Sequence, residues 1–252
     1  MNTYAIVKNL SKDLSKPTPW QELFRYRETD DIRQTDTASA EQIDTVYVKG
    51  RNVLLEEVRR PRVAIIGTRD MTPYGRDVTS SIVCALAKNP ARPVIISGLA
   101  LGVETQALNA ALEQGLPTVA IIANGTDDDI YPSHNTELGK KILEKGGCIL
   151  SPFPQMTMPT AWNFITKNKV LATVSDLIII PETKVRGGAI ISARYADKTG
   201  AVVAAVPGRL NDETSRGCNR LIGTGTAHAL YDISLLENPS YLRNLNIMFK
   251  QD

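Results

Sequence analysis

Hydrophobic positions gather into short consecutive runs from residue 63 onward. The runs cover residues 63–66, 94–97, 118–123, 148–151, 177–181 and 202–206. Segments of helical length and composition lie between them, at residues 75–88, 103–114, 135–145 and 188–198. Strands that are apolar on consecutive positions are buried on both faces, and their alternation with helices implies right-handed crossovers. The pattern therefore predicts an α/β fold with a doubly wound, mostly parallel sheet.

The first 45 residues differ from the rest of the chain. They are polar, with little periodicity, and Pro17 and Pro19 interrupt any early helix. We expect a small, loosely packed N-terminal appendage over residues 1–45. A short strand at residues 46–50 then leads into the core domain, which we place at residues 46–235. Residues 236–252 form a C-terminal tail in this division.

Composition narrows the class of protein. The chain has 252 residues, of which 42% are hydrophobic, so it can bury a sizeable core. It contains no run of eighteen apolar residues and no signal-peptide pattern, so we expect a cytoplasmic protein without a membrane partner. Cys84, Cys148 and Cys218 are too few and too widely spaced for a disulfide framework or a Cys-x-x-Cys metal site.

The first strand ends in a loop that suits an anion. Ligands of doubly wound sheets bind beyond the carboxyl ends of the strands. Here Gly67, Thr68 and Arg69 follow the strand, without the second and third glycines of a dinucleotide-binding loop. Backbone N–H groups and the Thr68 hydroxyl can hold a phosphate oxygen, and Arg69 adds a fixed positive fork. Ser97 and Gly98, after the second strand, begin a similar turn and predict a second anion site. The alternative is that the small residues of both turns serve only the packing of strand against helix.

Aromatic and cationic residues follow the fourth strand. Phe164 comes shortly before Lys167, Asn168 and Lys169, and Trp162 comes just before Phe164. Unpaired bases stack on aromatic rings while phosphates pair with ammonium groups, so this composition is typical of a single-stranded nucleic-acid site. The alternative is that the aromatic rings belong to the core and the lysines to a solvated helix face.

Further basic groups follow the fifth and sixth strands. Gly187 and Gly188 begin a helix, with Lys184 and Arg186 beside them, which again describes an anion site. The Asn219 amide lies after the sixth strand, together with Arg209, Arg216 and Arg220. A nearly neutral chain, with a net charge of +2, can therefore still have one basic edge.

The sequence favours neither metal nor acid–base chemistry. The carboxylates at residues 127–129 are adjacent and diverge, so we interpret them as a solvated turn. Glu182 has no nucleophile or histidine partner in motif order, and His134 and His228 lie outside any known catalytic motif. We therefore expect no metal, no cofactor and no catalytic residue.

Eight stretches resemble the DNA-processing protein A (DprA/Smf) family in order and spacing, over residues 46–228. They are VYVKG, VAIIGTRDMTPYG, ISGLALGVETQALNAAL, TVAIIANGTDDDIYP, FITKNKVLA, GGAIISARYA, VAAVPG and GCNRLIGTGT. The resemblance implies an extended Rossmann fold without a nucleotide cofactor. It also implies a protein of natural transformation and DNA recombination that binds single-stranded DNA, forms a homodimer and helps to load the RecA recombinase.

The same resemblance implies roles for particular residues. Arg69 matches the arginine of the family's G-[ST]-R loop, a ligand of backbone phosphate. Residues 167–169 match an R-N-R run, with Phe164 at the aromatic position before it, a candidate for base stacking. Residues 187–188 match a Ser-Gly turn that is another phosphate contact.

The chain departs from the family pattern at several positions. Leu101 and Leu108 stand where an arginine and a histidine are usual, and Glu104 stands where an aspartate is usual. Lysines at 167 and 169 keep the charge of arginine but lose its bidentate fork, so we expect weaker or differently shaped DNA binding. The chain also ends soon after the core, so we expect no C-terminal winged-helix domain.

The leading hypothesis is a non-enzymatic protein that binds single-stranded DNA without sequence preference. One alternative is an enzyme like the LOG-type nucleoside-monophosphate phosphoribohydrolases. Those enzymes carry P-G-G-x-G-T-x-x-E after the fifth strand, where this chain has PETKVRGGAIISA with its glutamate ahead of the glycines. A second alternative is a sensor of a small nucleotide signal that uses the same loops.

Overall fold

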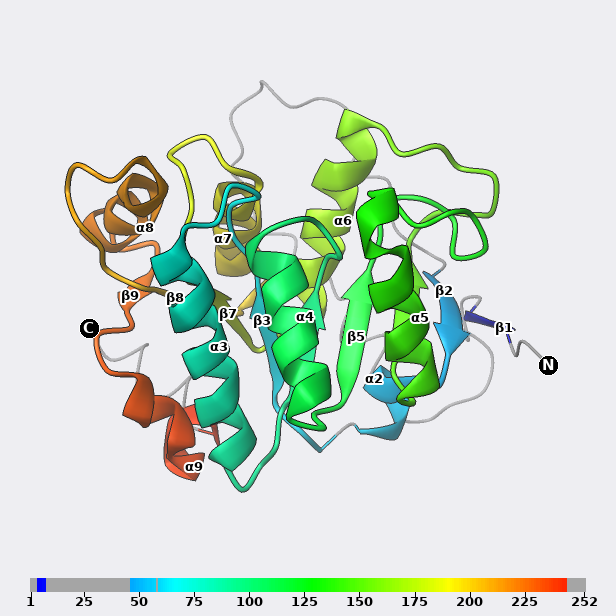
Figure 1. Ribbon diagram of the computed structural model, residues 1–252, viewed down its shortest axis with the longest axis horizontal. Helices are drawn as coiled ribbons and strands as arrows, with labels where there is room; N and C mark the ends of the chain where they lie inside the picture. Colours follow the sequence, from blue (N-terminus) through cyan, green and yellow to red (C-terminus); the bar gives the residue numbers. More distant parts are fainter. Residues whose placement is uncertain (1–3, 8–45, 58, 244–252) are drawn as a thin grey trace.

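A single mixed sheet organises the protein. The computed structural model describes residues 4–7, 46–57 and 59–243, and in these nine strands pair in the order β1-β2-β6-β5-β4-β3-β7-β8-β9. Pairing is parallel from β6 to β9, and β1 and β2 are antiparallel additions at one edge. The strands are β1 (Tyr4–Val7), β2 (Val46–Gly50), β3 (Arg62–Ile65), β4 (Val94–Ser97), β5 (Thr118–Ile121), β6 (Cys148–Ser151), β7 (Leu177–Ile180), β8 (Val202–Ala205) and β9 (His228–Ala229). The predicted α/β fold with a doubly wound, mostly parallel sheet is confirmed (Figure 1).

Helices cover both faces of this sheet. They are α2 (Val53–Glu56), α3 (Pro73–Lys88), α4 (Val103–Glu113), α5 (Thr136–Glu144), α6 (Ala161–Val174), α7 (Gly188–Thr199), α8 (Glu213–Gly223) and α9 (Pro239–Arg243), with 3-10 turns η1 (Ser133–Asn135) and η2 (Ile233–Glu237). Figure 1 shows α3, α4 and α5 on one face and α6 and α7 on the other. Successive residues of β3 and the position after it are buried in two different hydrophobic clusters. Val63 and Ile65 lie in the hydrophobic cluster under α3 and α4. Ala64 and Ile66 lie in the hydrophobic cluster under α6 and α7. This two-sided burial explains why the strands are apolar on consecutive positions.

The two ends of the core differ from the expectation. Residues 4–7 pair with β2, although the N-terminal pattern predicted no strand there, and the rest of the predicted appendage lies outside the described residues. In the predicted tail, Leu236, Tyr241 and Leu242 are buried in the cluster of α3 and α4. The Asn89 side chain donates to the Leu236 carbonyl at 2.8 Å, so this segment packs on the end of α3. The domain boundaries themselves stay predictions.

The three cysteines are free thiols. Cys148 and Cys218 are buried, and burial raises the pKa of each thiol to about 12. A thiol with so high a pKa is protonated and unreactive near neutral pH. Among the described residues, no helix is long and apolar enough to span a membrane.

The strand order reverses at β3. Strands β4, β5 and β6 follow on one side of β3, and β7, β8 and β9 follow on the other. Connections leaving β3 and β7 therefore run to opposite faces, which opens a crevice at the carboxyl ends of these two strands. The loops that follow β3 and β7 flank this crevice.

Candidate functional site

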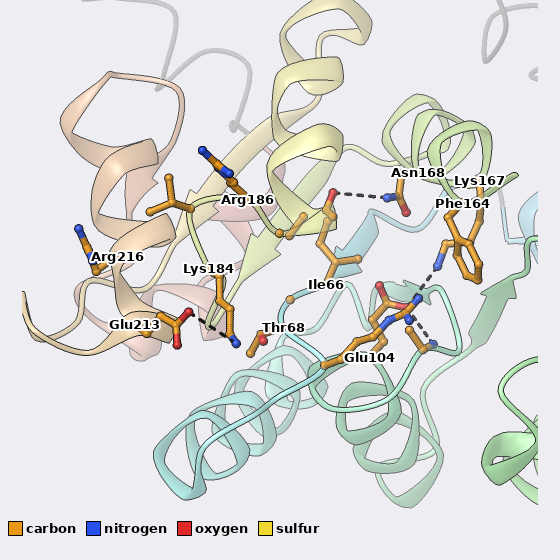
Figure 2. A pocket seen from close by; sticks show the side chains of 17 residues that line it. Ile66, Thr68, Glu104, Phe164, Lys167, Asn168, Lys184, Arg186, Glu213 and Arg216 are labelled. Atoms are coloured by element: carbon orange, nitrogen blue, oxygen red, sulfur yellow. Dashed lines mark hydrogen bonds and ion pairs between the residues drawn. The ribbon is translucent and has the colours of Figure 1, made fainter. Parts of the chain in front are cut away.

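A half-open pocket of about 590 Å³ lies at this switch point. Its walls come from the loop after β3, the start of α4, the middle of α6, the turn before α7 and the first turn of α8 (Figure 2). Its volume is that of an ordinary ligand site. Five segments that are far apart in sequence thus meet around one space.

Most of the predicted site residues line this pocket. The structure brings eight of the twelve together there: Gly67, Thr68, Arg69, Phe164, Lys167, Asn168, Gly187 and Gly188. Four others do not line it: Ser97, Gly98, Lys169 and Asn219. The convergence of separate β-to-α turns, which is the central structural expectation from the sequence, is therefore present.

The β3 loop is fixed by backbone contacts. A Cβ at Gly67 would lie 2.6 Å from the Glu182 carbonyl oxygen and 2.7 Å from a Val103 methyl group, so only glycine fits there. The Thr68 N–H donates to the Glu182 carbonyl at 2.8 Å, and the Val103 N–H donates to the Thr68 carbonyl at 3.2 Å. The exposed Arg69 extends from this loop, with its guanidinium carbon 5.1 Å from the centre of the Phe164 ring. Arg69 is thereby positioned at the pocket without an ion-pair partner among the described residues.

The Glu182 carboxylate anchors three elements. It is 2% exposed and accepts hydrogen bonds from the Thr72 N–H (2.9 Å), the Thr72 hydroxyl (2.6 Å) and the Thr214 hydroxyl (3.1 Å). Thr72 caps α3, and Thr214 lies in the first turn of α8. Because these donors already engage both of its oxygens, Glu182 holds the end of β7 to the starts of α3 and α8.

Lys167, Asn168 and Lys169 point in three directions. Successive helical residues are rotated by about 100°, so three in a row cannot share one face. The Lys167 ammonium is buried, 3.1 Å from the Gly98 carbonyl oxygen and 3.3 Å from Glu104 Oε2. Asn168 donates to the Gly188 carbonyl at 3.4 Å. The predicted cationic run is therefore not a single phosphate-binding unit.

Lys169 lies outside the pocket. Its ammonium is 5.4 Å from the Trp162 ring centre and 4.9 Å from that of Tyr195. Trp162 is 45% exposed, so it is not the core residue that the alternative interpretation proposed. Lys169 and Trp162 belong to the outer surface of α6 and α7.

The geometry after β4 is at odds with the predicted second anion site. The Ser97 hydroxyl is buried and donates to the Ile65 carbonyl at 2.6 Å. The Gly98 carbonyl accepts from Lys167, and a Cβ at Gly98 would collide with the Lys167 ammonium. Glu104 Oε2 accepts the Ala100 N–H at 3.0 Å. A buried ion pair fills the space that a phosphate would need.

Asn219 has a structural role beside the pocket. Its amide donates to the Gly208 carbonyl at 2.9 Å and accepts the Gly208 N–H at 3.0 Å. Both polar atoms of the side chain are thus used to fix the loop that joins β8 to α8. Asn219 borders a shallower depression that it shares with Arg216 and Arg220.

Cations surround the turn before α7. Lys184 lies 2.9 Å from Asp70 Oδ2 and 3.7 Å from Glu213 Oε1, and hydrogen bonding to Asp70 raises the Lys184 pKa and lowers that of Asp70. Arg186 and Arg216 line the pocket and form no ion pair within the described part of the chain. Gly187 is the N-cap of α7 and supplies no side-chain cap, which leaves the N–H groups of Gly188 and Ala189 for an anion. This wall of the pocket suits phosphate.

Two features of the site were not predicted. Tyr131, which is 47% exposed, contacts Phe164 edge to face, with the ring centres 5.9 Å apart. The sequence signal that could have identified Tyr131 is the presence of an aromatic residue in the turn after β5. Glu104 was noted only as a departure from the family pattern, and its pairing with Lys167 joins residues 63 positions apart.

The two leucines that depart from the family pattern, and the carboxylates of the turn after β5, do not form part of the pocket. Leu108 is fully buried in the cluster of α4 and α5, and Leu101 is 39% exposed in the loop before α4. Asp128 accepts the N–H groups of Gly125 (3.1 Å) and Met156 (2.9 Å), as suits a turn. Among the described residues, no group of three or more His, Cys, Asp or Glu side chains is arranged to hold a metal ion.

Comparisons with known proteins identify the family of this chain. The family model described as DNA recombination-mediator protein A matches residues 33–238. Protein Smf of Synechocystis is 34% identical over 176 residues, which are 70% of this chain and 43% of that protein. This chain thus spans less than half the length of that relative.

Solved structures show the same core. DNA processing protein A from Streptococcus pneumoniae has a TM-score of 0.69 and 30% identity, and the match covers 77% of this chain and 66% of that one. DNA processing protein A from Helicobacter pylori, whose structure was described for its single-stranded DNA binding mode, gives the same TM-score and identity over 89% of this chain and 97% of that chain. On the extent of the family match and these structural similarities, the chain belongs to the DNA-processing protein A (DprA/Smf) family.

Proposed function

We propose that this protein binds single-stranded DNA without sequence preference, through the pocket at the β3/β7 switch point, and acts in DNA processing by binding. The observation that carries the proposal is the convergence on one pocket of Arg69, Arg186, Arg216 and the uncapped start of α7. The family membership and the DNA binding of the Helicobacter pylori relative support it.

The chemistry of the pocket suits both parts of a nucleotide. Unpaired guanidinium groups and helix amides bind phosphate oxygens, which every nucleotide of the strand supplies. Phe164 lines the pocket, and the planar Arg69 guanidinium over its ring gives a base a second planar group on which to stack. Stacking of this kind tolerates any base, because each base has a π-face.

The layout also favours a strand over a single nucleotide. Figure 2 shows Arg216 and Phe164 at opposite ends of the lining side chains, with the α7 turn between them. The pocket is half-open to solvent, so a chain can enter it from the open side. In the sequence, Glu182 was the candidate for a catalytic base. Both oxygens of its carboxylate accept hydrogen bonds from Thr72 or Thr214, which supports binding rather than catalysis.

Replacing Arg69 by alanine tests the proposal. We expect Arg69→Ala to weaken binding of unrelated single-stranded sequences equally, by about 1.5–3 kcal/mol or roughly 10- to 150-fold, because it removes charge-assisted hydrogen bonds to phosphate. Fluorescence anisotropy with two labelled oligonucleotides of different composition measures this. Lys145→Ala is the matched control, because it removes one exposed positive charge at the C-terminal end of α5. Equal affinity of both variants would refute the proposed site.

The proposal extends to partners. We propose that a second copy of this chain and the RecA recombinase are its protein partners, and that it acts in the cytoplasm, as the family resemblance implies. Light scattering of the purified chain measures its oligomeric state. A pull-down with RecA, with and without oligo-dT, tests the second partner, and absence of both interactions would restrict the proposal to DNA binding.

A further inference from the structure

Tyr131 continues the aromatic surface of the pocket toward solvent. It does not line the pocket itself, yet its ring contacts Phe164, which does, at 5.9 Å between ring centres and 60° between planes. The Arg69 guanidinium lies over the same Phe164 ring. Arg69, Phe164 and Tyr131 thus form a contiguous row of three planar groups.

The loop that carries Tyr131 is held in place. Ile130, its neighbour, packs into the cluster of α4 and α5, where a Cβ at Gly139 would collide with the Ile130 side chain. The Asn124 amide donates to the Asp129 carbonyl at 3.0 Å. A ring on a fixed backbone, with only two side-chain torsions, loses little entropy when a planar ligand stacks on it.

Charge around Tyr131 selects the part of a nucleotide that can lie there. Asp127 lies 3.4 Å from Lys49, whereas the exposed Asp129 has no ion-pair partner among the described residues. A phosphate beside Asp129 would be repelled, whereas a neutral base would not. The surface beside Tyr131 therefore suits a base, and the wall lined by Arg186 and Arg216 suits the phosphates.

We propose that Tyr131 is a second stacking platform, which binds the base adjacent to the nucleotide held in the pocket. The inference rests on the proposed function and gives the strand a path: it leaves the pocket past Phe164 and crosses Tyr131. A mononucleotide fills the pocket alone and gains nothing from Tyr131. The bound length of DNA therefore exceeds one nucleotide on this side.

The test compares two ligands and three variants. We expect Tyr131→Ala to weaken oligo-dT binding about tenfold and to leave binding of thymidine monophosphate unchanged, since stacking platforms act on each base separately. Tyr131→Phe keeps the ring and should bind both ligands as the native protein does. Tyr231→Ala is the matched control, because Tyr231 is 78% exposed and does not line the pocket.

The outcomes separate this inference from the proposed function. Loss of oligo-dT affinity in Tyr131→Ala but not in Tyr131→Phe, with photocrosslinking of a 5-iodouracil oligonucleotide to Tyr131, supports the second platform. Oligo-dT affinity of Tyr131→Ala equal to that of Tyr231→Ala, while Arg69→Ala binds weakly, overturns the second platform alone. Failure of the native protein to bind oligo-dT overturns the proposed function and this inference with it.

Discussion

Lys167 stabilises the pocket from inside instead of reaching into solvent. Its side chain is 2% exposed, and its ammonium contacts the Gly98 carbonyl, just after β4, and the Glu104 carboxylate, in the first turn of α4. Burial of a charge is costly unless a partner compensates for it, so Lys167 and Glu104 depend on each other. The pair fixes the loop that forms one wall of the site.

Neutralising one member of this pair should destabilise the fold. We expect Glu104→Gln to lower the free energy of unfolding by about 3 kcal/mol, because it leaves the Lys167 charge buried without a counter-charge. Urea denaturation followed by circular dichroism measures the change. The double variant Glu104→Gln/Lys167→Met removes both charges and should recover most of the loss.

An exposed pair provides the control for this experiment. Glu137 and Lys140 form an ion pair at 2.7 Å on the surface of α5, with more than half of each side chain exposed. Glu137→Gln should leave the unfolding free energy unchanged within error, because exposed pairs contribute little. A Glu104→Gln variant as stable as Glu137→Gln would contradict a structural role for the buried pair.

At the scale of elements, α8 is held close to the end of β7. The Gly217 N–H donates to the Thr183 carbonyl at 2.9 Å, and the Thr183 N–H donates to the Thr214 carbonyl at 2.7 Å. A Cβ at Gly217 would meet the Thr183 carbonyl oxygen and lie 2.6 Å from that of Lys184. This approach places the first turn of α8 at the pocket.

Two glycines of α8 give opposite expectations. Gly217→Ala should lower stability by about 1–3 kcal/mol through overpacking and weaken oligo-dT binding, because it moves the helix away from β7. At Gly223, near the end of the same helix, nothing lies within 4 Å of an added Cβ, so Gly223→Ala should be neutral or stabilise by up to about 1 kcal/mol. Thermal unfolding and anisotropy measure both effects. Equal unfolding temperatures and equal oligo-dT affinities of the two variants would show that the close packing of α8 is unimportant.

The elements were predictable where their signal is local. The apolar runs located β3 to β8 to within one or two residues, because strands buried on both faces need apolar side chains throughout. The strand at residues 4–7 pairs with β2 at the sheet edge, and its sequence, YAIV, is also an apolar run. It was not predicted, because this run is short and stands alone in a polar segment. Partners distant in sequence were also hidden: nothing near Lys167 indicates that Glu104 will lie 3.3 Å away. The convergence of the loops followed from topology, whereas the direction of each side chain did not.

At the scale of the molecule, charge placement matters more than net charge. The chain carries a net charge of only +2, yet Arg69, Arg186 and Arg216 meet at one edge of the sheet. The sheet order determines this edge, because the loops after β3 and β7 flank the same crevice. A nearly neutral protein can therefore bind a polyanion through one surface, and that binding must depend on salt.

The salt dependence of DNA binding tests this account most directly. Anisotropy titrations of the native protein with oligo-dT, duplex DNA and a mononucleotide, each at two salt concentrations, give affinities and salt slopes. The account predicts that oligo-dT binds tightest, with a log–log slope of about −0.7 for each phosphate neutralised. A mononucleotide that binds as tightly as oligo-dT, or an oligo-dT affinity that does not change with salt, would contradict it.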